Sequence, residues 1–390
     1  MKRLQLNSTP SQAQNARGDV SEILAYRKKV MALPQWSRWQ WHYKNRITTL
    51  AGLRKWLVLS PEEEDAVNLV SNRMCVTLTP FIVSNMSVLS SGCPLRKQFI
   101  ATPDELKLSK NELSDPCGEV RDTVLPRLVK RYPSRVLLLA TNTCAAYCRY
   151  CTRRRIIGKT SPVFVISTRE IDNVVRYLKQ NKDICDVLIS GGDPLILSDT
   201  KITELLYKLR AVKSIGVIRM GTRVPVTLPQ RVNQQLCRIL KNFGPVYVNI
   251  HFNHVSELSE ETMNACETMA DNGIILGSQT VLLKDINDTT EALSSLFLAL
   301  TRIRVRPYYL YQCDLAEGTE HFRVPVRDGI KLMKTLRGYL PGYAVPTYVI
   351  DAPGGGGKVP VGQDYVVEHT KTTVVLKNYK GKTYFYPEPL

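Results

Sequence analysis

A cysteine triplet constrains this chain more than any other stretch. Cys144, Cys148 and Cys151 stand at C-x3-C-x2-C spacing within residues 141–155, directly after the apolar run 136–140. Such a run is typical of a buried strand. Three thiolates on one tight loop can bind three irons of a cubane 4Fe-4S cluster, and with no fourth cysteine nearby the last iron stays open to another ligand. We therefore interpret the triplet as an iron–sulfur site.

Two other uses of these cysteines fit less well. A structural zinc site usually takes four ligands, commonly as two separated pairs, and no His or Cys pair completes this triplet. A thioredoxin-like redox pair could use Cys148 and Cys151, but it would leave Cys144 without a role. The iron–sulfur interpretation accounts for all three thiols.

The length and composition of the chain predict a large globular protein. Its 390 residues are 44% hydrophobic, which suits one large α/β domain with flanking pieces, or two domains. The other seven cysteines are scattered, as in proteins of a reducing compartment. The polar N-terminus holds no secretory signal, and no apolar stretch reaches membrane length. We expect a cytoplasmic protein that does not enter a membrane.

The net charge of +18 raises the hypothesis of nucleic-acid binding. Half of it comes from residues 1–60, which hold eleven Lys and Arg against two acidic residues. Within them, residues 36–46 interleave aromatic and basic side chains that could stack on nucleic acid. Alternatively, Trp36, Trp39 and Ile47 dock on the protein body while the basic residues stay solvated. We favour the second interpretation.

The front of the chain is expected to be mostly helical. Residues 1–20 are polar and basic, and we expect them to be loose or disordered. Residues 21–126 then form a helical region and a long wrapping connection, residues 127–345 the main α/β unit, and residues 346–390 a C-terminal segment. The expected N-terminal helices are 20–32, 36–48, one opening at LAGLRKWL, and one from Pro61 to about Val76, after Ser60 as N-cap.

Strand and helix patterns alternate regularly from residue 135 onward. Parallel strands with right-handed helical crossovers curve toward a barrel, and six such units predict a partial (βα)6 barrel. Its active residues should lie at the carboxyl ends of the strands. The expected strands are 136–141, 186–190, 216–221, 246–251, 275–281 and 304–311, and the expected helices are 168–180, 199–211, 229–242, 259–271, 288–300 and one after Val326.

Polar residues follow several of these strands. Gly191 and Gly192 would let a ligand approach the backbone, and Asp193 could accept a hydrogen bond from an amino group. Gly-Gly-Asp-Pro is equally good turn chemistry in any protein. His251 and His254 follow the fourth strand, and a lone histidine such as His254 is as often structural as catalytic.

A glycine run near the C-terminus marks a second candidate site. Residues 351–358 read DAPGGGGK. A phosphate-binding P-loop would need Gly where Ala352 stands and Ser or Thr where Val359 stands, so that interpretation fails. Four glycines can instead lay backbone against a flat ring while Lys358 reaches inward, as a Schiff-base lysine of pyridoxal phosphate requires. This is one option, because most lysines are solvated surface groups.

Taken together, the motifs resemble a known family. CxxxCxxCTRRR, SGGD, HFNH, RVRPYYLYQCDL, EHFR and DAPGGGGK occur here in that order. The cysteine loop and the SGGD segment are similar to those of radical S-adenosylmethionine enzymes, and with DAPGGGGK the chain resembles the lysine 2,3-aminomutase family from about Trp36 to Pro389. The resemblance implies an α/β radical S-adenosylmethionine partial barrel over 127–345 and a pyridoxal phosphate-lysine loop within 346–390.

The resemblance also implies a role for each motif residue. The three cysteines would bind the 4Fe-4S cluster, and Lys358 would be the catalytic lysine that holds pyridoxal phosphate. Arg153 would bind the substrate carboxylate, and Asp314 and Asp351 would bind its distal ammonium. The S-adenosylmethionine site would be lined by Gly191, Gly192, Asp193 and His251, and the pyridoxal phosphate group by Arg131, Arg135 and Gln279.

The implied activity is that of an isomerase that interconverts L-lysine and β-lysine. A 5′-deoxyadenosyl radical would start the 1,2-amino shift on the pyridoxal phosphate cofactor. An arginine 2,3-aminomutase making β-arginine is the alternative, since two aspartates can bind a guanidinium as well as an ammonium. A more distant alternative is an inactive relative that binds nucleic acid, which the net charge motivates.

Partners and metals also follow from the resemblance. An electron donor such as flavodoxin or ferredoxin would reduce the cluster, and a homo-oligomer is expected, without nucleic acid as a partner. Some family members carry zinc on a cysteine of the fifth βα region and on cysteines of the C-terminal tail. Here residues 286–289 contain no cysteine and none follows Lys358, so we predict no zinc.

Overall fold

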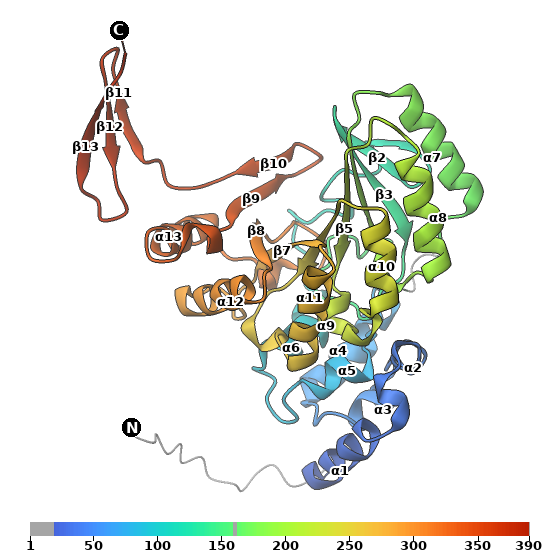
Figure 1. The fold of residues 1–390 in the computed structure, drawn as a ribbon. Helices are drawn as coiled ribbons and strands as arrows, with labels where there is room; N and C mark the ends of the chain where they lie inside the picture. Colours follow the sequence, from blue (N-terminus) through green and yellow to red (C-terminus); the bar gives the residue numbers. More distant parts are fainter. Residues whose placement is uncertain (1–18, 159–161, 390) are drawn as a thin grey trace, which may run out of the picture.

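The fold is a curved sheet with helices on its outer face (Figure 1). The structure is a computed structural model that describes residues 19–158 and 162–389. The N-terminal helices lie at one end of the sheet, and a small C-terminal sheet stands apart from the body (Figure 1). The loose terminus predicted for residues 1–20 lies outside the described residues, except for the last two.

The six predicted βα units are confirmed. Their strands pair in parallel and in chain order. The strands are β3 (Arg135–Thr141), β4 (Asp186–Gly191), β5 (Val217–Thr222), β6 (Val246–His251), β7 (Ile275–Leu282) and β8 (Arg306–Gln312). The helices are α7 (Thr168–Gln180), α8 (Asp199–Arg210), α10 (Gln234–Asn242), α11 (Glu260–Asp271), α12 (Thr290–Arg302) and α13 (Val326–Leu336).

Four further strands widen this sheet to ten. The antiparallel β1 (Thr123–Leu125) and β2 (Leu128–Tyr132) precede β3, and the parallel β9 (Thr347–Ala352) and antiparallel β10 (Gly357–Pro360) follow β8. The order runs from β1 to β10 without closing, as a partial barrel requires. The sheet thus extends past residues 127–345 at both ends, and the division into separate units stays a prediction.

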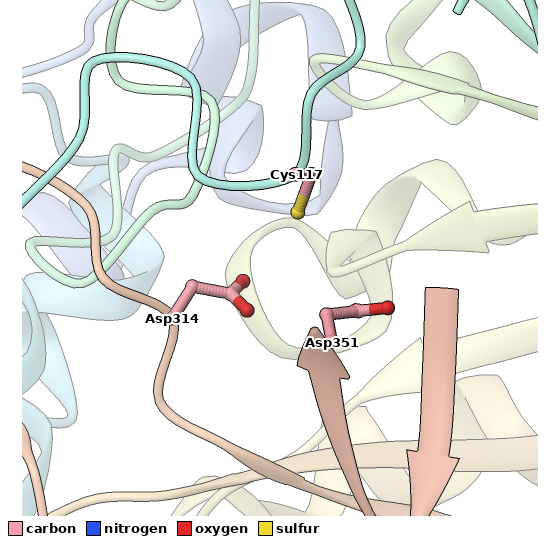
Figure 2. A group of neighbouring side chains, drawn as sticks. All are labelled: Cys117, Asp314 and Asp351. Atoms are coloured by element: carbon pink, nitrogen blue, oxygen red, sulfur yellow. The ribbon is translucent and has the colours of Figure 1, made fainter. Parts of the chain in front are cut away.

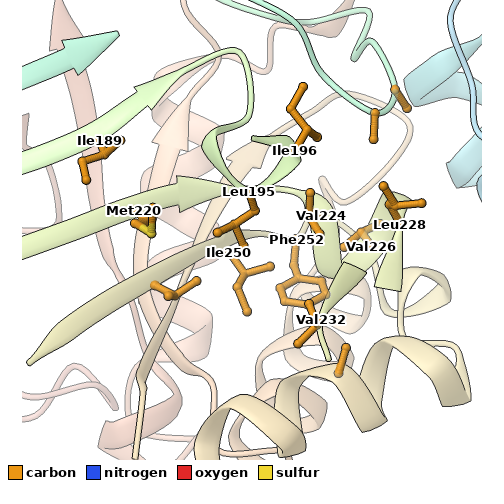
Figure 3. Close-up of a cluster of buried hydrophobic side chains, with 14 of the residues drawn as sticks. Ile189, Leu195, Ile196, Met220, Val224, Val226, Leu228, Val232, Ile250 and Phe252 are labelled. Atoms are coloured by element: carbon orange, nitrogen blue, oxygen red, sulfur yellow. The ribbon is translucent and has the colours of Figure 1, made fainter. Parts of the chain in front are cut away.

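Side-chain alternation along the strands gives the barrel two different faces. Ile189, Met220 and Ile250 are fully buried and pack toward the helices, in the same apolar cluster as Leu195 and Phe252 (Figure 3). Successive strand residues point to opposite faces. The neighbours of these residues therefore face the inside of the barrel, and Leu188, Ser190, Arg219, Gly221, Asn249 and His251 line a cavity there.

The N-terminal region is helical, but two predicted helices are shorter than expected. The helix expected at 36–48 is a 3-10 turn (Pro34–Ser37) and the short α2 (Trp39–Lys44), because Arg38 between them is extended. The helix expected from Pro61 to about Val76 ends at Leu69. The other helices are α1 (Val20–Met31), α3 (Leu50–Arg54), α5 (Pro80–Ser84) and α6 (Pro94–Phe99).

Tertiary contacts explain the early end of the fourth helix. A tight 3-10 turn over Val70–Asn72 stops it. The carbonyl of Met74 then accepts a hydrogen bond from Arg149, and that of Thr77 accepts one from the Tyr147 amide. The predicted start is confirmed, because Ser60 and Glu63 form a capping box.

The aromatic residues of the basic segment pack on the body. Ile47 is buried in the main core, and Trp36, Trp39 and Trp41 pack against it. His42 is also buried, at 4.5 Å between its ring centre and that of Trp36. These contacts confirm the docking interpretation of residues 36–47, because the rings that could stack on nucleic acid pack against the core and are partly buried there.

The C-terminal sheet is a feature that the sequence did not predict. Strands β11 (Val366–His369), β12 (Thr373–Lys377) and β13 (Thr383–Pro387) pair only with one another. None of their residues is buried, and Phe385 is 72% exposed.

Among the described helices of the whole chain, none combines the length and the apolar character that crossing a membrane requires.

Candidate active site

The cysteine loop follows β3 and is held by the N-terminal region. Arg46 Nη1 donates a hydrogen bond to the Cys144 carbonyl at 2.8 Å. The amide of Tyr147 donates to the Thr77 carbonyl at 2.9 Å. Backbone groups of the loop are therefore satisfied by residues far earlier in the chain, as buried loops require.

Glu105 joins the loop to the wrapping connection by buried ion pairs. Its carboxylate accepts two hydrogen bonds from Arg149, at 2.8 and 2.6 Å, and one from Arg154 at 2.8 Å. The side chains of Arg149 and Glu105 are at most 1% exposed. Burial raises the pKa of the Glu105 carboxyl, but the two arginines outweigh it and leave the pKa below its usual value.

Glu119 makes a second connection of the same kind. Its carboxylate pairs with Arg153 at 2.7 Å and with Arg155 at 2.9 Å. Arg153 also donates to the Ser190 hydroxyl at 3.3 Å, at the end of β4. These bonds orient the Arg153 guanidinium along the cavity wall, where the predicted substrate carboxylate would bind.

The three thiols fit the group predicted for them. Burial raises the pKa of Cys144 well above its usual value, and Asp193, Cys151 and Cys148 raise it further. Burial and Cys148 raise the pKa of Cys151 to about 11. Thiolates this close repel one another unless a cation lies among them, and bound iron supplies that charge. All three cysteines line the cavity.

Two glycines let the end of β4 press against the cysteine loop. A Cβ on Gly191, where φ is +118°, would lie 2.2 Å from the Thr141 carbonyl oxygen. A Cβ on Gly192 would lie 2.1 Å from that of Thr143. The Gly192 amide donates to Thr141 at 2.6 Å. Only glycine fits at these two positions, which places bare backbone beside the cysteines.

The carboxylate of Asp193 accepts several hydrogen bonds from the protein itself, which the sequence did not predict. One carboxylate oxygen accepts from the Thr222 hydroxyl at 2.7 Å and the other from the Arg223 amide at 2.6 Å. It also caps the turn at Leu195. These bonds connect the ends of β4 and β5, and its predicted bond to a ligand amino group stays a prediction.

The glycine run forms a tight hairpin between β9 and β10. Asp351 and Lys358 stand directly opposite each other in its register. The Lys358 ammonium therefore reaches both Asp351 oxygens, at 2.9 and 2.8 Å. The Tyr132 hydroxyl accepts from the Lys358 amide at 2.7 Å. The hairpin so directs Lys358 into the cavity.

Cys117 joins the two predicted ammonium-binding aspartates. Figure 2 shows its sulfur pointing from the wrapping connection toward Asp314 and Asp351. One ligand atom from each of the three lies within 4.8 Å of the others. Burial and Asp351 raise the pKa of Asp314 to about 6. Burial and Asp314 raise the pKa of Cys117 to about 12. The cluster gathers two carboxyl groups and a thiol beside the Lys358 ammonium, which pairs with Asp351 at 2.8 Å.

The other predicted cofactor residues line the same cavity. His251 stacks on Tyr150, whose hydroxyl lies 2.9 Å from its Nε2, and burial holds the His251 pKa well below the usual value. His254 instead caps a short turn with Ser256 and does not line the cavity. Arg131 pairs with Asp122 at 2.8 Å, Gln279 donates to Tyr311 at 3.2 Å, and Arg135 stacks over Tyr132.

One cavity thus brings together all fourteen predicted site residues. They are Cys144, Cys148, Cys151, Arg153, Gly191, Gly192, Asp193, His251, Gln279, Arg131, Arg135, Asp314, Asp351 and Lys358. Sequence reasoning missed Cys117, Glu119 and Arg223, which line it too. The length of the wrapping connection was a signal for the first two, since long segments are often functional.

Comparison with known proteins defines the class first. The profile of the Radical SAM superfamily matches residues 138–296, which span the cysteine loop and the strands from β3 to β7. This is the part of the chain that forms most of the barrel. The class is therefore that of radical S-adenosylmethionine proteins.

The family then follows from closer relatives. The profile described as lysine-2,3-aminomutase matches residues 333–390. The L-lysine 2,3-aminomutase of Acetoanaerobium sticklandii is 45% identical over 91% of this chain and 85% of its own. That of Fusobacterium nucleatum is 45% identical over 91% and 83%. The glutamate 2,3-aminomutase of Clostridioides difficile is 36% identical over 93% and 86%. The chain belongs to the lysine 2,3-aminomutase family.

The Glu105 ion pairs predict a large loss of stability on neutralisation. Glu105→Gln leaves the guanidinium of Arg149 buried without its counter-charge, and we expect a loss of about 3 kcal/mol in the free energy of unfolding. Urea denaturation measures it. Glu64→Gln, at the exposed pair with Arg54, is the matched control and should cost far less. Equal losses for the two variants would contradict this account.

The raised pKa of Asp314 predicts that its substitution stabilises the protein in a pH-dependent way. Because its folded-state pKa is about 6, above the usual 3.8, the folded protein holds this proton where the unfolded chain has released it. The contribution of Asp314 to the stability of the folded protein therefore falls as the pH rises from about 4 to 6. Asp314→Asn should stabilise the cofactor-free protein above pH 6 by on the order of 2 kcal/mol.

Thermal unfolding at several pH values measures this gain. The difference between Asp314→Asn and the unsubstituted protein should shrink as the pH falls from about 6 to 4, because the unfolded-state aspartate then takes up its proton as well. Asp328→Asn, at an exposed carboxylate of α13, is the control. A stabilisation by Asp314→Asn that is the same at pH 4 and pH 7 would contradict the raised pKa.

Proposed function

We propose that this chain is a lysine 2,3-aminomutase, which interconverts L-lysine and β-lysine. The observation that carries the proposal is one cavity lined both by the cysteine triplet and by Lys358 with two aspartates. The relatives named for L-lysine, at 45% identity, support the same substrate. The proposal gives each residue of the cavity the role that the sequence motifs predict for it.

The residues of the cavity fit the cofactors that the family implies. A 4Fe-4S cluster with S-adenosylmethionine supplies a carbon-centred radical when bound, and pyridoxal phosphate supplies a conjugated ring that stabilises a neighbouring radical. Cys144, Cys148 and Cys151 would hold the cluster, and Lys358 the ring aldehyde. Arg131 and Arg135 bring positive charge for the phosphate, which a guanidinium binds through fixed donors.

The substrate is held at its two ends by opposite charges. Arg153, fixed by Glu119 and Ser190, would bind the carboxylate. Asp314 and Asp351 would bind the distal cation. Fixing both ends orients the carbon chain between them, and positioning of this kind contributes much of the barrier reduction in catalysis.

The distal site is compact enough for one ammonium. An ammonium has three N–H donors, and acceptors around one tetrahedral nitrogen stand about 4.7 Å apart at hydrogen-bond distance. Asp314, Asp351 and Cys117 offer one atom each, all within 4.8 Å of one another. A single ammonium can therefore contact all three, as a lysine substrate requires. The ammonium of the substrate would also replace Lys358 at Asp351, which frees that lysine for the cofactor.

The electron donor and the cellular compartment predicted from the sequence are also part of this proposal. An electron donor such as flavodoxin or ferredoxin would reduce the cluster. All ten cysteines are free thiols, which suits a reducing cytoplasm. The alternative of an inactive nucleic-acid-binding relative is disfavoured by the intact cavity and by the docked tryptophans.

An anaerobic assay tests the proposed function. Protein reconstituted with iron, sulfide, pyridoxal phosphate and S-adenosylmethionine should convert lysine to β-lysine, identified by mass-resolved chromatography, and should turn over arginine at least tenfold less well. β-Arginine from arginine without β-lysine from lysine would establish the alternative. No product from either would refute both.

Covalent trapping tests the role of Lys358 separately. Borohydride reduction of protein loaded with pyridoxal phosphate should label the peptide that contains Lys358. Lys358→Arg should abolish the label, whereas Lys284→Arg, at a lysine outside the cavity, should keep it. A label on another peptide would refute the assignment.

The C-terminal sheet supports the proposed homo-oligomer. A three-stranded sheet with no buried face is marginal by itself, and Val367, Phe385 and Tyr386 are exposed on it. Burial of these side chains against a second copy would stabilise the sheet.

Light scattering after size exclusion tests this expectation. The unsubstituted protein should be an oligomer, and Phe385→Asp should lower its mass at micromolar concentration. Tyr207→Asp is the matched control, because Tyr207 is an equally exposed aromatic residue on α8, and it should leave the mass unchanged. A monomeric unsubstituted protein would contradict the proposal.

A further inference from the structure

The side chain of Arg223 is buried and contacts the cysteine loop. It follows β5 and is 7% exposed. Its Nη1 donates to the sulfur of Cys148 at 2.7 Å and also to the Tyr150 hydroxyl. The sequence motifs did not predict Arg223 as a site residue.

A buried network fixes this guanidinium in place. Its Nη2 donates to Gln98 at 2.6 Å and pairs with Glu257 at 3.3 Å. Asn253, which is fully buried, donates to Gln98 and to the Tyr150 hydroxyl. The Phe99 ring lies 4.4 Å from the guanidinium carbon. The side chain has no room to turn away from Cys148, and an arginine stays charged at any physiological pH.

A fixed positive charge on a cluster thiolate has a defined redox effect. Reduction adds one electron to an iron–sulfur cluster, and N–H donors to its sulfurs stabilise the added negative charge. The interaction is strong here because water is excluded around Arg223. Groups that contact a ligand rather than the metal tune metal sites in this way.

We propose that Arg223 is a positioning residue that raises the reduction potential of the 4Fe-4S cluster by donating to the Cys148 thiolate. The inference rests on the proposed function for the presence of the cluster. It assigns Arg223 to the one-electron reduction that precedes the reaction, and to no contact with the amino-acid substrate.

A redox titration followed by electron paramagnetic resonance tests this role. It is made on anaerobically reconstituted full-length protein without S-adenosylmethionine or lysine. Arg223→Gln should shift the equilibrium of cluster reduction at least tenfold toward the oxidised form, which for one electron is about 59 mV lower in midpoint potential.

Arg231→Lys is the matched control. Arg231 is fully buried eight residues further on, but its donors go to the carbonyls of Leu195 and Leu197 and to Asp199. Its substitution should leave the midpoint potential unchanged. An unchanged potential in Arg223→Gln, or equal shifts in the two variants, would overturn the proposal.

A second variant keeps the test decisive if Arg223→Gln does not load a cluster. Arg223→Lys preserves the buried charge opposite Glu257, but a single ammonium cannot reach Cys148 and Gln98 together. Its midpoint potential should be lower than that of the unsubstituted protein, and an equal value would overturn the proposal. Measurement of iron content distinguishes a failure of the Arg223 inference from a failure of the proposed function. If the unsubstituted protein binds no iron–sulfur cluster, the proposed function itself is refuted.

Discussion

Buried arginine–glutamate pairs between the cysteine loop and the wrapping connection are the interaction on which the site depends. Glu105 holds Arg149 and Arg154, and Glu119 holds Arg153. Each pair joins two segments that lie outside the long helices and strands of the barrel. Removal of one partner leaves a charge in a nonpolar interior, which is costly. The loop is therefore held in one conformation by charge pairing more than by regular secondary structure.

The Asp351–Lys358 part of the cavity is built by strand register. Asp351 and Lys358 are seven residues apart in sequence but face each other because the glycine turn folds β9 back on β10. A shift of one residue would turn Lys358 to the other face of the strand. The parallel pairing of β8 with β9 brings Asp314, which follows β8, toward Asp351. Cys117 comes from the wrapping connection, whose Pro116 carbonyl accepts a hydrogen bond from the Gly354 amide of the turn. The hairpin thus sets the Asp351–Lys358 pair, and two other segments complete the cluster.

Local pattern was sufficient for the barrel and for the motif residues. The alternation after residue 135 fixed six strands and six helices, because burial imposes those periods on the sequence. It could not find Glu105, Glu119 or Cys117, whose partners lie elsewhere in the chain and leave no local periodicity. Arg223 was missed for the same reason. The sheet β11–β13 was also missed, since its exposed strands lack the alternation of a half-buried sheet.

The position of Lys358 in the last strands of the barrel has a consequence for synthesis. A ribosome makes the cysteine loop and every parallel strand up to β8 before it makes β9 and β10, and chains fold from the N-terminus as they emerge. A nascent chain can therefore form the thiol triplet while it still lacks both Lys358 and Asp351. The proposed attachment of a cofactor to Lys358 would have to wait until β9 and β10 are made, whereas the proposed binding of a cluster by the three cysteines would not. The order of residues along the chain thus imposes an order on the maturation of the protein.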